Sequence, residues 1–302
     1  MTWVAWRVQR DQYLVAGAAV AAVLAFLAIS GLDPYSSWAT GSAHGLAVLL
    51  SFLPGALGLA LGASLVGSEE ESGTNRLAWT QSVSRRAWLG RKVVLGATVT
   101  GALAAVSSAL GAWWATTGFG QGPTMMPKVF GISGAVVVAY GLFAFALGVL
   151  LGAAVGRAGW AFALGAPVVV AVRLWVDASR NALVAPTTLV NPPSLAYQQH
   201  GWPLNLAYLP IGRTSPAAGL TWAQAWTMPR SRLVVGCVQH GPTSQYFARS
   251  LRCSRAAHLQ LVVQYQPDRH YWALQGAESA IFAALALVAT AAAFVVVARR
   301  RH

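Results

Sequence analysis

The chain has 302 residues, of which 56% are hydrophobic and 10% carry a charged side chain. This composition excludes an ordinary soluble domain and is typical of an integral membrane protein. The formal net charge is +13 at pH 7, but the basic residues lie beside apolar runs of about 20 residues, the length that crosses a bilayer. Basic residues in such positions set membrane topology, so we expect no nucleic-acid partner.

Six apolar runs predict six membrane-spanning helices. An N-terminal interfacial segment, residues 1–13, precedes the first run. That run is long for a cleaved signal peptide, and further spans follow it, so we interpret it as a span. The expected spans are, in chain order, residues 14–31, 43–67, 93–116, 129–156, 160–175 and 279–298.

Prolines and glycines inside these runs predict bends and close helix contacts. Pro54 in the second span and Pro167 in the fifth each lack an amide hydrogen, which favours a kink. Small residues spaced four apart let neighbouring helices approach each other closely. The second and fourth spans carry such series, namely Gly58 and Gly62, and then Gly148, Gly152 and Gly156.

The distribution of basic residues predicts that both chain termini are cytoplasmic. The N-terminus, the loop at residues 68–92, the turn at Arg157 and the basic C-terminal tail all lie on one side of the expected spans. The two short loops on the other side carry only Lys128. Because basic residues accumulate in short cytoplasmic loops, this asymmetry orients the chain.

The loop at residues 68–92, which we call the charged loop, is the longest polar run between two spans. It contains three acidic and five basic residues, with apolar residues recurring between them at roughly helical spacing. We expect short amphipathic pieces that dock a partner on the cytoplasmic side. The acidic residues Glu69, Glu70 and Glu71 are equally compatible with capping the next helix, because acids favour a helix N-terminus.

Residues 177–276, between the fifth and sixth spans, predict an extracytoplasmic domain. Prolines predict loops in its first half, and the run at residues 244–264 predicts a helix. The expected fold is therefore an all-α integral membrane protein. Its membrane part comprises residues 14–176 and 277–302, the second of which ends in a basic cytoplasmic tail.

The two cysteines, Cys237 and Cys253, both fall in this outer segment. Outside the cytoplasm an isolated pair is most simply a disulfide, which would stabilise a small domain by roughly 3 kcal/mol. A zinc site with His240 and His258 is an alternative by ligand spacing, and free thiols are a third.

The chain carries no signature of a catalytic centre. It lacks the common hydrolase and metalloprotease motifs and the glycine-rich phosphate loop that binds ATP, so we expect neither an enzyme nor a bound metal. The span centres are almost free of ionisable residues, and His44 and Arg173 lie near outer span ends, where side chains reach water. A self-powered carrier is therefore disfavoured, and another subunit would have to supply the motive force.

Two separated blocks of sequence resemble the type-2 ABC exporter permeases of actinobacteria. The first block lies in the charged loop and includes Glu69, Glu71, Gly73, Thr74, Arg85, Trp88 and Lys92. The second block leads into the last span and includes Tyr265, Gln266, Pro267, Arg269, Tyr271, Trp272, Gln275 and Glu278. The likeness covers most of the chain and is weaker at about residues 180–236.

This resemblance implies the permease subunit of an ATP-driven exporter in the plasma membrane. Such a permease half pairs with a second permease copy, identical or different, and with cytoplasmic ATPase subunits that bind ATP and magnesium. The charged loop would hold the element that couples to the ATPase. The transport path would run along the permease–permease interface, largely beside spans two and five, in which Pro54 and Pro167 lie.

The sequence leaves the transported molecule open. An amphipathic small molecule, a drug, an antibiotic or a peptide would suit an apolar path. A different class of protein is the alternative: a membrane sensor or assembly partner that does not transport and whose extracytoplasmic domain binds a ligand.

Overall fold

The computed structural model describes residues 17, 37–71, 84–116, 125, 127–194, 200–212, 251, 255 and 258–299. The N-terminal segment 1–13, nearly all of the first expected span, Gly73, Thr74 and both cysteines lie outside these residues. The predictions made for them, including the disulfide, therefore stay predictions. The chain divides into two compact units, which we describe separately.

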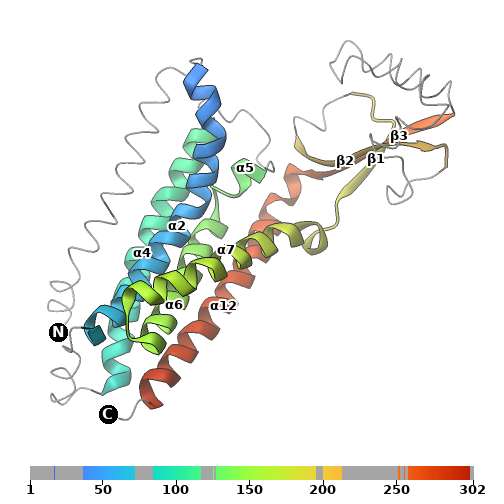
Figure 1. Cartoon of the computed structure of the whole chain (residues 1–302). Coiled ribbons are helices and arrows are strands. Elements are labelled where there is room, and N and C mark those ends of the chain that lie inside the picture. Colours follow the sequence, from blue (N-terminus) through green and yellow to red (C-terminus); the bar gives the residue numbers. More distant parts are fainter. Residues whose placement is uncertain are drawn as a thin grey trace. The chain divides into compact units, whose positions relative to one another are not determined.

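The first unit, which we call the helical unit, comprises Met1–Gln121, Lys128–Arg180 and Ala273–His302. In the described part of the chain, five helices are long and apolar enough to cross a membrane (Figure 1). They are α2 (Ser37–Glu71), α4 (Arg85–Thr116), α6 (Ala135–Val155), α7 (Ala158–Leu183) and α12 (Tyr271–Arg299). These five correspond to expected spans two to six. A multi-pass membrane protein is therefore confirmed.

Several helices are longer than the apolar runs that predicted them. Helix α2 continues through Glu71 and α4 begins at Arg85, so helix occupies both edges of the charged loop. Ser84 starts α4 as its N-cap, because its Oγ accepts a hydrogen bond of 3.3 Å from the Ala87 amide. Helix α7 extends to Leu183 and carries Arg173, Asp177 and Arg180 in its last three turns.

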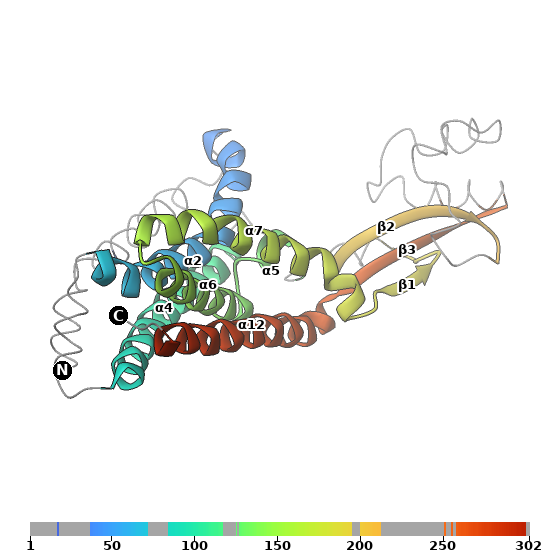
Figure 2. The ribbon, with the colours of Figure 1, turned by 60° about the horizontal axis from the view of Figure 1, so that its bottom comes forward.

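Glycines bring α2 and α6 together along their length (Figure 2). A Cβ atom added at Gly152 would lie 2.7 Å from the Ala63 carbonyl oxygen, and one at Gly148 would lie 2.5 Å from the Leu59 carbonyl oxygen. Gly58 and Gly62 face the backbone of α6 more closely still, because Cβ atoms added there would lie nearer to carbonyl oxygens of α6. Both predicted glycine series are thus packing surfaces, except that Gly156 ends α6 in a left-handed conformation at φ 72°.

The core of the helical unit lies where four helices meet. Leu61, Leu65 and Val66 of α2 pack against Leu89 of α4. The same cluster contains three residues of α6 and two of α12, namely Phe145, Val149, Ala153, Ala293 and Val297. Alanines and glycines interleave with these larger side chains, as is usual for helices that pack within lipid.

The second unit comprises Gly122–Pro127 and Asn181–Trp272, and contains a three-stranded antiparallel sheet. The strands are β1 (Thr187–Val190), β2 (Gly201–Pro210) and β3 (Leu259–Pro267), in the order β1-β3-β2. The short helix α5 (Pro127–Phe130) and the 3₁₀ turn η2 (Asp268–His270) complete the described elements. The fold is therefore mostly helical, and the prediction of an all-α protein was wrong.

The helix predicted over residues 244–264 was wrong from Leu259 onward. Leu259–Pro267 is the central strand, and its side chains Leu261 and Val263 are buried against Leu251. A short apolar run with adjacent valines fits a strand buried on both faces as well as a helix, and periodicity alone does not separate the two. Pro203 and Pro210 are tolerated because β2 lies at a sheet edge, with a register shift after Pro203.

Candidate functional site

Glu69 and Lys92 join the two edges of the charged loop. The Lys92 ammonium forms an ion pair with the Glu69 carboxylate and donates a hydrogen bond of 3.4 Å to the Leu65 carbonyl. It also lies 4.5 Å from the centre of the Trp88 ring, a cation–π contact. Lys92 is only 5% exposed, so these contacts form a buried clamp between the end of α2 and the start of α4.

The clamp changes the interpretation of the acidic residues in the charged loop. Glu69, Glu70 and Glu71 form the last turn of α2, where the helix dipole disfavours negative charge. Lys92 supplies the compensating positive charge to Glu69. Glu71 is exposed, as are Arg86 and Arg91 on α4, so these three charged side chains of the described part of the loop are available to a partner.

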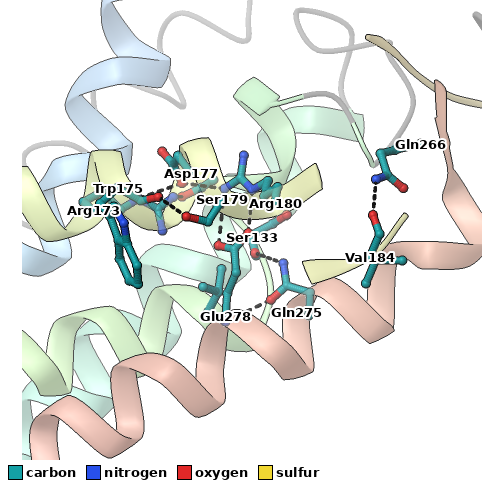
Figure 3. A network of polar contacts seen from close by, with 12 residues as sticks. Ser133, Arg173, Trp175, Asp177, Ser179, Arg180, Val184, Gln266, Gln275 and Glu278 are labelled. Atoms are coloured by element: carbon teal, nitrogen blue, oxygen red, sulfur yellow. Dashed lines mark hydrogen bonds and ion pairs between the residues drawn. The ribbon is translucent and has the colours of Figure 1, made fainter. Parts of the chain in front are cut away.

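A second polar cluster lies at the other end of the helical unit, where α4 and α7 end and α6 begins (Figure 3). The Arg180 guanidinium donates hydrogen bonds to Glu278 on α12, of 2.5 Å through Nε and 3.4 Å through Nη2. Its Nη2 also donates to Asp177 on its own helix at 2.7 Å. Glu278 is fully buried, and the Asp177 side chain is 35% exposed. This pair fastens α7 to α12.

The Gln275 side chain on α12 caps helix α6. Its Oε1 accepts a hydrogen bond of 2.9 Å from the Val136 amide, and its Nε2 donates one of 3.1 Å to the Ser133 carbonyl. The N-cap residue of α6 is Gly134, which has no side chain to satisfy the first amides and has a φ of 87°. A Cβ atom there would lie 2.6 Å from Gln275. The glycine therefore makes room for a cap that a distant helix supplies.

Arg173 belongs to the same cluster but has weaker contacts. It pairs with Asp177 through Nε at 3.6 Å and donates through Nη2 to the Gly131 carbonyl at 3.3 Å. We expected this side chain to reach water, but it is only 2% exposed. The expectation was wrong because Tyr140 of α6 covers the guanidinium, whose carbon lies 5.2 Å from the ring centre.

The second sequence block divides between the two units. In the sheet-containing unit, Gln266 is fully buried, donates to the Val184 carbonyl at 2.7 Å and contacts His270 at 2.8 Å. Arg269 donates to the Thr187 hydroxyl at 3.4 Å. The other members are Tyr265 and Pro267 in β3, Tyr271 and Trp272 at the start of α12, and Glu278 further along it. The contacts of this block are distributed along each unit, and among the described residues they do not converge on one pocket.

Sequence reasoning missed Asp177 and Arg180 as members of a site. Arg173, Asp177 and Arg180 are spaced four and three apart on one face of α7, and Glu278 is an acid at the edge of the last apolar run. Ionisable residues beside the hydrocarbon region are expensive unless they are paired, so these four charges were a usable signal.

Pro54 and Pro167, the two expected kink positions, lie inside continuous helices.

Within the described part of the chain, five apolar helices with buried polar clusters at the two ends of the helical unit define a multi-pass membrane protein. The family described as ABC-2 membrane transporter related matches residues 30–180, which is half of the chain. The protein therefore belongs to this family, and the predicted resemblance to type-2 ABC permeases is confirmed. Comparison with curated proteins gives no match.

Family membership gives the protein its general role. It is a transporter permease component, and the family implies that it works in a membrane with an ATPase subunit. The matched region includes the whole charged loop and extends to Arg180, so it contains the Glu69–Lys92 clamp and three members of the polar cluster.

Proposed function

We propose that this chain is the permease subunit of an ATP-driven exporter whose ATPase docks on the charged loop. The observation that carries the proposal is the buried Glu69–Lys92 clamp inside the region that matches the ABC-2 family. The sequence carries no glycine-rich phosphate loop, so in this proposal ATP and magnesium bind in the partner ATPase.

The clamp gives the loop a way to transmit force. A push on residues 72–83 acts on two helix ends that Lys92 holds together, so α2 and α4 would move as one body. Glycine contacts then couple α2 to α6 backbone to backbone. Rigid-body movement of packed helices is an established route by which a small shift at one end reaches the other.

Charge supports a cytoplasmic location for the charged loop and both termini. Arg86, Arg91, Arg157 and Arg299 are exposed at the end of the helical unit where α2 and α6 end. The cluster at the other end contains two arginines and two carboxylates and is neutral in total. An excess of exposed basic residues marks the cytoplasmic side.

The exposed side of α7 supports a second permease copy, identical or different. Trp160, Leu164, Leu174 and Trp175 are each more than half exposed. In a membrane this surface contacts lipid or another helix, and a transport path between two such copies would be apolar. We therefore propose that the exported molecule is amphipathic: a small molecule, a drug, an antibiotic or a peptide.

The test is co-purification of the tagged chain from mild detergent, followed by mass spectrometry and ATPase assays. We expect an ATPase subunit with a phosphate loop to co-purify. Glu71→Lys should weaken this association, because Glu71 is exposed and its substitution leaves the clamp intact. A chain that purifies without an ATPase would contradict the proposal and favour the sensor or assembly-partner alternative.

The clamp has its own control in a charge swap. Glu69→Lys alone buries two like charges and should uncouple ATP hydrolysis from transport, as should Lys92→Glu alone. The double variant Glu69→Lys/Lys92→Glu restores an opposite-charge pair and should recover most of the coupling. If the single variants hydrolyse ATP in response to substrate as the wild type does, the clamp does not transmit force.

A further inference from the structure

Arg173 and Arg180 lie two turns apart on the same side of α7 but differ in how fully they are paired. Arg180 has hydrogen bonds of 2.5 and 2.7 Å to two carboxylates. The shortest polar contact of Arg173 is 3.3 Å, to a backbone carbonyl. Its Nη1 is buried and has no hydrogen-bond partner among the residues that the structure describes.

Tyr140 presents a second buried donor in contact with this arginine. Its hydroxyl also has no partner within the described part of the chain, and its ring lies beneath the Arg173 guanidinium. Phe282 holds the ring edge-on, with centroids 5.5 Å apart. Gly55 lies against the hydroxyl and leaves it room by lacking a side chain. Helices α6 and α7 thus bring two buried side chains into contact, and each carries a donor without a partner among the described residues.

Unsatisfied donors are costly in such a place. Leaving one buried costs about 1–3 kcal/mol, and more for a charged group. Arg173 and Tyr140 are 2% and 1% exposed, so bulk water does not reach these donors. Two neighbouring side chains that each carry such a donor indicate a ligand with acceptor oxygens for both.

We propose that Arg173 and Tyr140 bind the carboxylate or phosphate oxygen of an amphipathic ligand. A guanidinium with a free N–H group pairs best with an oxyanion, and the tyrosine hydroxyl adds a second donor to the same oxygen group. Phe282 packs against the Tyr140 ring and against Phe143, and both phenylalanines are buried and apolar. They suit a hydrocarbon tail and disfavour an inorganic ion, which would lose its hydration without compensation.

Asp177 allows the site to accept negative charge. The Asp177 carboxylate contacts both arginines. Its oxygen lies 2.7 Å from Arg180 and 3.6 Å from Arg173, so the contact with Arg180 is the closer one. An arriving oxyanion would replace the long contact with Arg173, and Asp177 would remain paired with Arg180 and partly in water. The ligand is either a single-chain amphiphile or a phospholipid, since both present an oxyanion on an apolar chain.

The binding test uses the full-length chain in an uncharged maltoside detergent and does not require the ATPase. Thermal unfolding is followed with laurate, dodecanol and dodecylammonium, which share one tail and differ in the head group, and separately with phosphatidylglycerol. We expect laurate or phosphatidylglycerol to raise the melting temperature, because a ligand that binds the folded state stabilises it. Dodecanol and dodecylammonium should have no such effect.

Tyr140→Phe separates a binding role from a structural one. Removing a hydroxyl without a partner should leave the unliganded protein as stable as before or more so, yet weaken oxyanion binding about tenfold. Arg173→Lys should retain part of the affinity, and Tyr271→Phe, in the other unit, serves as the matched control.

A loss of the laurate response in Tyr140→Phe assigns the site to single-chain amphiphiles, and a loss of only the phosphatidylglycerol response assigns it to lipid. Equal responses of wild type and Tyr140→Phe to both ligands would overturn the proposal, and so would a laurate response no larger than that of dodecanol.

Discussion

The Arg180–Glu278 pair offers the sharpest test of what stabilises the helical unit. Glu278→Leu removes a fully buried carboxylate and both of its contacts with Arg180. Breaking a buried pair by removing one partner costs about 3–5 kcal/mol, because the remaining charge stays buried. Arg180 keeps Asp177 at 2.7 Å, so we expect a loss near 3 kcal/mol. Glu278→Gln should cost about half as much, because its amide oxygen still accepts one hydrogen bond.

The measurement is the free energy of unfolding in mixed micelles, with helix content followed by circular dichroism. Arg180→Met/Glu278→Leu is the decisive control, because replacing both members of a buried pair with apolar residues is often neutral. Asp177→Asn should cost less than about 1 kcal/mol, since its side chain is partly exposed. If Glu278→Leu unfolds at the wild-type free energy, or if the double variant is less stable than either single one, the pair does not fasten α7 to α12.

Two further substitutions test local packing by the same measurement. Gln275→Ala should lower the free energy of unfolding by about 1–2 kcal/mol, because it leaves the Val136 amide buried without its cap; an unchanged value would show that α6 needs no cap from α12. Gly152→Ala should cost about 1–3 kcal/mol, since its new Cβ would press on the α2 backbone. Its matched control is Gly276→Ala, where nothing lies within 4 Å of the added atom and helix propensity favours alanine by about 1 kcal/mol. The reverse order of stability would mean that α2 and α6 do not approach each other as the glycines indicate.

The helices were predictable because a membrane helix is specified locally. A run of about 20 apolar residues crosses a bilayer whatever its neighbours are, and glycines spaced four apart lie on one side of the helix that carries them. The charged loop was also recognised from local sequence, because it is a polar run between two apolar runs. Its interpretation changed only when the structure placed Lys92 against Glu69 and so used two of the expected docking residues inside the chain.

The sheet and the polar cluster were not predictable in this way. Strand β3 takes its identity from pairing with β1 and β2, which precede it by more than 45 residues, so its own sequence was ambiguous. Arg180 and Glu278 are 98 positions apart, and Gln275 caps an amide 139 positions away. Neither spacing nor composition brings such residues together. The signal that could have been used was energetic: charges next to the hydrocarbon region require partners.

The interior of the helical unit shows where movement would cost least. Lipid tails are as apolar as the side chains, so burial adds little to helix association within a membrane, and polar contacts and close packing decide it. Here the clamp and the Arg180–Glu278 pair fasten the two ends, and glycines fasten α2 to α6. Between α4, α6 and α12, however, lies a groove of about 600 Å³, lined by residues such as Ala97, Leu142 and Ala283. If α12 slid along this groove, no hydrogen bond between the described side chains that line the groove would break. The polar end contacts therefore set the positions between which the helices can move, and variants of those contacts should alter transport more than variants of the groove.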